Sequence, residues 1–305
     1  MHSPSAFFAL RQVLFSLVLT IPVIFSPSLQ AQTEPHWEDY IIFGAGFMGP
    51  NSLPIPRTPK GRVENINMAM VTGVANLSPG DKTYNPATFA YFTLVEDLVS
   101  FDYYMVPVEY FVMSEAIKDE RNVFVAFEDE HFAIGDVYLN SNVQVFNRAK
   151  FHAAVRAGFK IPSSGMVGAA RFTDSPGYNL DASFGSYLVQ REGLELELFG
   201  MGGFYSYQTQ GGYVNYRQND ALLFGLGLGL KLRDWQIDNV VRGYLGYFDL
   251  RDKPIVYRLN ATRDFGNIRL LAALQVGLND FDYVSPEIGI GYLFPAVNIA
   301  QRVSK

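Results

Sequence analysis

The stretch from Asp39 to Gly61 contains a pattern that could bind a dinucleotide. Gly44-Ala45-Gly46-Phe47-Met48-Gly49 follows an apolar run and matches G-x-G-x-x-G, the arrangement that cradles a pyrophosphate at a helix N-terminus. Glu64 follows at a distance where a carboxylate would bind a ribose. The residues between include prolines at positions 50, 54, 56 and 59, which break any helix. We therefore reject dinucleotide binding and expect an extended segment.

Histidines are the other residues that could carry catalysis or bind a metal. Beyond the N-terminal leader they are His36, His131 and His152. The acidic neighbours of His131, Glu128 to Glu130, could bind a divalent cation, but a solvated charged loop is the commoner arrangement. His152 lies among polar residues and reads as a satisfied interior side chain. We predict no catalytic residue, no metal, no cofactor and no enzyme activity.

The composition indicates an exported chain. A short basic region and an apolar stretch end at Ala31, which predicts a cleaved signal peptide over 1–31. The sequence has no Cys among its 305 residues, which excludes disulfides and thiolate metal sites. Its formal net charge of −6, without any long basic run, makes nucleic acid an unfavourable partner.

Alternation with period two is the main structural signal. In 150–161, apolar residues such as Phe151, Val155 and Phe159 alternate with His152 and Arg156. Twelve segments show such a pattern, and each is close to the roughly 9–11 residues with which a tilted strand crosses a bilayer. The segments are 64–76, 86–96, 98–112, 135–147, 150–161, 177–189, 193–207, 221–232, 235–248, 254–263, 267–278 and 286–294.

Short and long connections alternate along the chain, as in outer-membrane barrels. The longer ones are expected at 113–134, 162–176 and 208–220. Together these patterns predict an all-β fold: a transmembrane antiparallel β-barrel of about twelve strands over 63–294. An extended Gly/Pro-rich segment, 32–62, precedes it as either a lumen plug or a periplasmic leader, and a periplasmic tail, 295–305, follows it.

The polar face of the strands predicts a charged lumen. Register places Arg156 near Asp181, and Lys231 near Glu195 or Glu197. No carboxylate is expected beside three arginines of later strands, Arg242, Arg258 and Arg269. Gly225, Gly227 and Gly229 form an inward column, against which another segment could lie or at which the barrel could bend. The candidate lumen residues are Asp136, Tyr138, Asn140, Asn142, Arg156, Lys160, Glu195, Glu197, Arg242, Arg258, Arg269 and the three glycines.

Several short stretches resemble an uncharacterised family of Gram-negative outer-membrane barrels. They are GPNSLPIP (49–56), IKDERN (117–122), GDVYL (135–139), DSPGY (174–178) and QND (218–220). The resemblance implies a barrel in the outer membrane and brings no ligand or activity. The layout is also loosely similar to that of fatty-acid and aromatic-hydrocarbon channels. A last strand that ends in Phe294 resembles the signal read by the barrel-assembly machinery.

The sequence thus predicts a protein of the bacterial outer membrane that acts as a channel or transporter for a small solute of unknown identity, which 32–62 could plug if it is not a periplasmic leader. Its other expected partners are outer-membrane lipid and, during biogenesis, the barrel-assembly machinery. The alternative function is a structural or interaction barrel that presents its outer loops. An outer-membrane hydrolase is the third interpretation.

Overall fold

The computed structural model describes residues 41–123, 125, 130–173, 175–211, 215–247 and 251–295, with only the backbone of 208–219 considered. The predicted signal peptide, residues 32–40 with His36, the acidic residues Glu128 and Asp129, and the tail after Pro295 lie outside this range. Within it, no helix is long and apolar enough to span a membrane.

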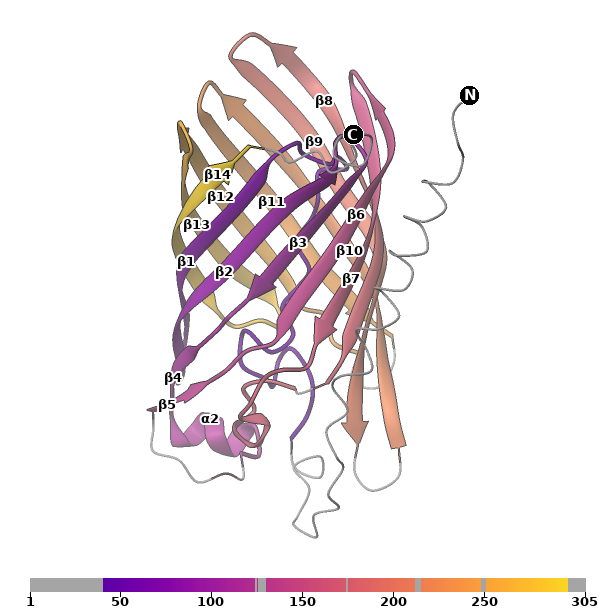
Figure 1. Cartoon of the computed structure of the whole chain (residues 1–305). Helices are drawn as coiled ribbons and strands as arrows, with labels where there is room; N and C mark the ends of the chain where they lie inside the picture. The colour runs from indigo at the N-terminus through magenta and orange to yellow at the C-terminus, as the bar shows by residue number, and fades with distance from the viewer. Residues whose placement is uncertain are drawn as a thin grey trace, which may run out of the picture. The chain divides into compact units, whose positions relative to one another are not determined.

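Twelve antiparallel strands close into a barrel, which confirms the predicted fold (Figure 1). Neighbouring strands follow one another along the chain, and β14 pairs with β1 to close the sheet, as in Met68 opposite Leu293. The barrel strands are β1 (Asn67–Ser78), β2 (Asp81–Val95), β3 (Val99–Met105), β6 (Val137–Arg148), β7 (Phe151–Ile161), β8 (Gly177–Arg191), β9 (Leu194–Gly211), β10 (Asn215–Leu232), β11 (Trp235–Gly246), β12 (Ile255–Phe265), β13 (Ile268–Asn279) and β14 (Val284–Phe294).

The alternation in the sequence becomes an alternation in burial. Along β7, Phe151, Val155 and Phe159 are exposed on the outer surface, whereas His152 and Arg156 are buried inside. Leu222 and Leu226 of β10 are likewise exposed. Large apolar side chains that face outward along most of the barrel strands are stable next to lipid and not next to water.

One predicted strand is interrupted. The segment 98–112 divides into β3 and β4 (Glu109–Met113), both of which pair with β2. Pro107 lies at the break and has no N–H to donate to the ladder. β4 in turn pairs with β5 (Glu130–Ala133), and α2 (Glu115–Glu120) lies between them.

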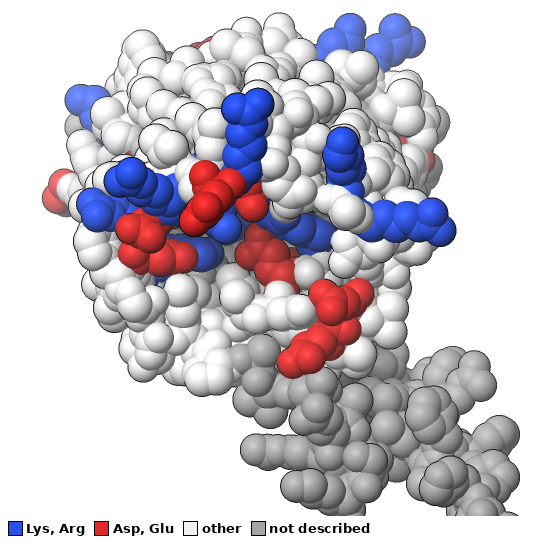
Figure 2. Space-filling model, turned by 90° about the horizontal axis from the view of Figure 1, so that it is seen from above, with Lys and Arg blue, Asp and Glu red and all other residues white. Residues whose placement is uncertain are grey.

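The two ends of the barrel differ, as predicted. Five tight turns, together with the start of β1 and the end of β14, lie at the upper end in Figure 1, which we name the turn end. The opposite end, named the loop end, carries α2, β4, β5 and the 162–176 connection with η3 (Val167–Ala169). Charged side chains of both signs lie side by side at the turn end (Figure 2).

The predicted loop at 208–220 is wrong. β9 continues to Gly211 and β10 starts at Asn215, so most of this segment is paired sheet. Its polar sequence lacks the apolar alternation used to find strands. Backbone hydrogen bonds extend a hairpin whether or not its side chains face lipid, so the sequence pattern underestimated these strands.

Candidate functional site

Residues 41–66, named the lumen segment, lie inside the barrel and run between its two ends (Figure 1). At the loop end, Asn51 donates a hydrogen bond to Glu109. At the turn end, the N–H of Val63 donates to Oε1 of Gln144 at 2.7 Å, and Gln144 donates to the carbonyl of Gly61 at 2.9 Å. Because its prolines disfavour both a helix and a central strand, the segment stays extended.

The GAGFMG stretch forms a tight turn at the loop end. The N–H of Met48 donates to the carbonyl of Gly44 at 2.9 Å, and that of Gly49 donates to Ala170 at 2.8 Å. The N–H of Ala45 donates to the Asp252 carboxylate at 3.3 Å. No helix follows among residues 50–66, so the geometry that a pyrophosphate needs is absent from this stretch.

A group of charged residues binds the lumen segment to the wall near the turn end, and we name it the latch. Nζ of Lys60 lies 2.6 Å from Asp238 and 3.9 Å from Glu197, and Nη2 of Arg62 lies 3.6 Å from Glu197. Nε2 of His152 lies 2.6 Å from the other oxygen of Glu197. His152 and Glu197 are buried, so the latch places the segment's cations on interior carboxylates.

The inward glycine column gives the lumen segment room. A Cβ atom on Gly225 would lie 3.1 Å from Cβ of Thr58, and one on Gly229 would lie 3.0 Å from Nζ of Lys60. Gly227 differs, because the Phe199 ring of the neighbouring strand covers it. Two of the three glycines therefore contact the lumen segment directly.

Gly61 should be irreplaceable where the segment crosses β8. Its φ of +75° is in the left-handed region, and a Cβ atom would lie 2.6 Å from Cα of Phe184. We expect Gly61→Ala to lower the unfolding free energy by at least about 1–2 kcal/mol, the backbone cost alone. Urea unfolding in detergent measures this loss. Gly46→Ala is the control, since nothing lies within 4 Å of its Cβ position; equal effects of the two changes would contradict the assignment.

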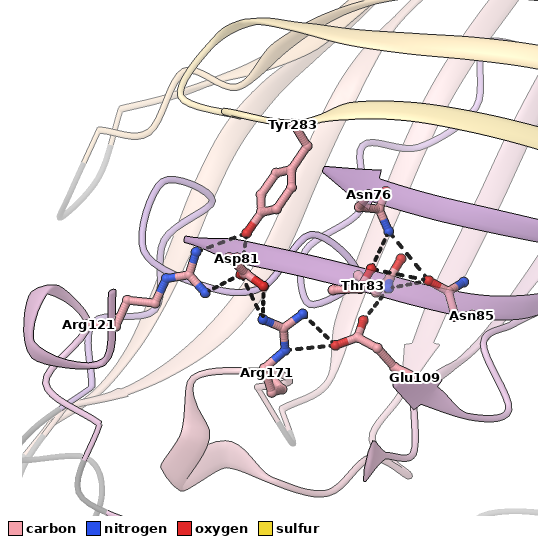
Figure 3. A network of polar contacts seen from close by, with 9 residues as sticks. Asn76, Asp81, Thr83, Asn85, Glu109, Arg121, Arg171 and Tyr283 are labelled. Carbon is pink, nitrogen blue, oxygen red and sulfur yellow. Dashed lines mark hydrogen bonds and ion pairs between the residues drawn. The ribbon is translucent and has the colours of Figure 1, made fainter. Parts of the chain in front are cut away.

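Buried ion pairs connect several segments at the loop end, and we name them the outer network (Figure 3). Arg171 contacts Asp81 at 2.7 Å and Glu109 at 2.6 Å, and Arg121 contacts Asp81 at 2.7 Å. The Tyr283 hydroxyl donates to Asp81 at 2.6 Å. Burial opposes the charge of Arg171, but Glu109 and Asp81 outweigh it and raise the pKa of its guanidinium. Burial also raises the pKa of Tyr283.

The predicted pairs on the lumen wall are present. Arg156 lies 2.9 Å from Asp181, and Lys231 lies 3.9 Å from Glu195. Lys160 lies 2.7 Å from Asp136. The first and third of these pairs are buried, whereas at the turn end Lys231 is exposed and Glu195 is partly exposed.

Polar residues of β6 form a connected row beside these pairs. Asn140 donates to Asp102 at 2.7 Å, and Asn142 donates to the same carboxylate at 3.0 Å. Tyr138 packs against Tyr104, with ring centroids 5.9 Å apart. These side chains line a lumen cavity of about 370 Å³.

The expectation that three later arginines lack carboxylate neighbours is wrong for two of them. Arg258 pairs with Glu287, and Arg269 lies 2.7 Å from Asp264. Asp264 is directly opposite Arg269 in the β12–β13 hairpin, in a position that the sequence interpretation assigned to the turn. Glu287 belongs to β14 and is reached across β13, so no nearest-neighbour register contains it. Arg242 agrees with the expectation and donates to Gln275 at 3.0 Å.

Several residues of the site were missing from the sequence prediction. Alternation along β3, β11 and β14 could have identified Asp102, Asp238 and Glu287 as inward-facing. No sequence signal places Arg57, Lys60 and Arg62 against the wall, because the lumen segment has no period and no register. The loop residues Arg121 and Arg171 were missed for the same reason.

Two of the histidines considered for catalysis, His131 and His152, contact neighbouring side chains of the fold. His131 lies on β5 and stacks on Phe111, with centroids 6.3 Å apart. His152 is held by Glu197 within the latch. Within the described ranges, no group of three or more His, Asp or Glu residues is arranged to hold a metal ion.

Comparisons with known proteins show a fold and no sequence family. No family model matches the chain, and no curated protein matches it. The structure of the COG4313 outer membrane channel from Pseudomonas putida F1 is similar, with a TM-score of 0.53 and 13% identity, covering 86% of this chain and 100% of that one. The NanC porin has a TM-score of 0.50 and 9% identity over 73% of this chain and 98% of that one.

The looser similarity to aromatic-hydrocarbon channels carries no weight. The Pseudomonas putida toluene transporter TodX covers 84% of this chain and 98% of its own, but the TM-score is 0.35 at 10% identity. The two better matches share a closed antiparallel barrel, and both come from proteins described as outer-membrane channels or porins. The chain therefore has the fold of bacterial outer-membrane channel barrels.

Proposed function

We propose that this protein is an outer-membrane channel for small polar solutes, and that the lumen segment regulates passage through it. The observation that supports this function best is the position of Thr58 and Lys60 against the inward glycines. The same segment lines the charged lumen cavity together with residues of the wall. A solute that crosses the barrel must pass this segment.

The latch suggests a closed resting state that can open. Hydrogen bonds to charged groups contribute about 1.5–3 kcal/mol each. If the segment opens by breaking one such contact of Lys60 or Arg62, the open state makes up roughly one tenth to one hundredth of the molecules. A barrel gated at this level conducts in rare events and responds strongly to changes in the segment.

Deletion of residues 32–62 tests the channel function. We expect the single-channel conductance in planar bilayers, or the rate of liposome swelling, to rise roughly tenfold, which needs only about 1.4 kcal/mol off the barrier. The deletion removes buried apolar side chains such as Leu53 and Ile55. Heat-modifiability on gels must therefore show that the barrel has folded.

Three results bear directly on the proposal. A folded deletion variant that conducts, beside a nearly silent full-length mature chain, supports regulation by the segment. If neither protein conducts nor passes solute, the channel function is wrong. Conductance that is equal and high in both would retain the channel and remove the role of the segment.

The outer network favours a second candidate, an interaction barrel. Its buried ion pairs connect β2, β4, the residue that follows α2 and the 162–176 connection, which makes the loop end an ordered surface. A closed lumen in both proteins above, together with a binding partner whose capture requires these loops, would favour this function.

A further inference from the structure

The cavity inside the barrel has an excess of positive charge. Of the described residues that line it, eight are Lys or Arg and three are Asp or Glu. Six of the eight cations form an ion pair with a carboxylate. The pairs are Lys60 with Asp238, Arg62 with Glu197, Arg156 with Asp181, Lys160 with Asp136, Arg258 with Glu287 and Arg269 with Asp264.

Arg57 and Arg242 are the two cations of the cavity without such a pair in the described part of the chain. Arg242 is 9% exposed, and its Nε atom has no hydrogen-bond partner. Its one hydrogen bond to a side chain goes to the neutral amide of Gln275 at 3.0 Å. The guanidinium of Arg57 lies over the rings of Phe89 and Tyr104, 4.3 Å and 5.2 Å from their centroids.

The two arginines belong to one electropositive cluster. Arg57, Arg156 and Arg258 line the same cavity as Arg242, and so does the carboxylate of Glu287. Glu287 is already bound by Arg258. In the β11–β12 register Arg242 faces Val256, so Arg258 is its diagonal neighbour, at about 7–8 Å between backbones. Buried like charges at this spacing repel each other unless an anion lies between them.

We propose that Arg57 and Arg242 bind the carboxylate of a small organic acid within the lumen. The planar guanidinium matches a carboxylate through two parallel N–H···O bonds, and Arg242, whose buried Nε has no partner, lines the cavity that would hold it. Arg57 belongs to the lumen segment and Arg242 to the wall, so the anion bridges the two. The assignment names the solute class of the proposed channel and rests on that function.

The cavity also fits the organic part of such a ligand. Small-molecule sites typically have volumes of about 300–1,000 Å³, and this cavity is about 370 Å³. Phe89, Tyr104 and Phe281 contribute aromatic surface, and Asn142, Asn179 and Gln275 contribute amides. Apolar rings beside a cation favour an acid with a compact apolar body over a bare inorganic ion.

Calorimetric titration of the full mature protein in detergent with benzoate tests this site. We expect saturable binding that weakens roughly 10- to 100-fold in Arg242→Gln, the loss expected for a charge-assisted hydrogen bond. Arg57→Gln should weaken it similarly and provides a second variant. Lys231→Gln is the matched control, because it removes the same charge from a residue that does not line the cavity.

Benzamide, the neutral analogue of benzoate, completes the test. Failure of benzamide to bind supports recognition of the carboxylate, whereas equal binding of benzamide and benzoate overturns it. Unchanged benzoate affinity in both arginine variants, or equal weakening in Lys231→Gln, also overturns the site. Binding without conductance would refute the channel and keep the anion site, and conductance without benzoate binding would do the opposite.

Discussion

A disulfide between positions 58 and 225 is expected to abolish conductance until it is reduced. The chain contains no Cys, so Thr58→Cys with Gly225→Cys introduces a single cross-link. A Cβ atom on Gly225 would lie 3.1 Å from Cβ of Thr58, and disulfides have about 3.5–4.5 Å between these atoms. The extended lumen segment must therefore shift by a few tenths of an ångström, which a segment outside the sheet can do.

The expected effect is large because a covalent bond replaces contacts that thermal motion can break. The latch contributes a few kcal/mol, whereas a disulfide stays closed in an oxidising buffer. Planar-bilayer recording should show no openings of the oxidised protein. Addition of dithiothreitol to the same membrane should restore the openings of the unlinked chain, so the oxidised protein is its own folding control.

Thr58→Cys alone is the control for the chemical change, since it cannot form an intramolecular disulfide. Its conductance should not respond to dithiothreitol. Openings that persist in the fully cross-linked protein would show that solute passes without movement of the segment at residue 58. The gating proposal would then fail even if the barrel conducts.

The barrel strands could be predicted from the sequence because each strand can be identified from its own alternation. β10 alternates Leu226 and Leu228 with glycines, and this pattern depends only on lipid outside the barrel and the lumen inside it. Neighbour relations follow from hairpin register, which correctly paired Arg156 with Asp181. Both inferences use local information and need no tertiary contact.

Side-chain contacts could not be predicted where they pass over an intervening strand or involve a segment without alternating apolar and polar residues. Arg258 reaches Glu287 over an intervening strand, and the chain positions of Lys60 and Glu197 are unrelated by any register. The lumen segment could be predicted as extended from its prolines. Its path through the barrel depends on the glycine column and on carboxylates of three different strands, β4, β9 and β11. Such contacts are set by three-dimensional fit, which alternation does not encode.

The outer network is the clearest example of this limit and leads to the largest expected loss of stability. Asp81, Glu109 and Arg171 are far apart in sequence and none is exposed. We expect Arg171→Met to lower the unfolding free energy by about 3–5 kcal/mol, because it leaves Glu109 buried without its cation. Urea unfolding in detergent measures this, and proteolysis of the 162–176 connection should speed up in parallel.

Two matched variants separate the ion pair from packing. Arg121→Met should cost less, since Asp81 keeps Arg171 and the Tyr283 hydroxyl. Arg171→Met combined with Glu109→Gln should recover most of the lost stability, because removing both charges of a buried pair is often close to neutral. A double variant as unstable as Arg171→Met alone would mean that the side chain of Arg171, stacked 4.5 Å from the Phe111 ring centroid, acts through packing. The charges would then contribute orientation to the loop end and little stability.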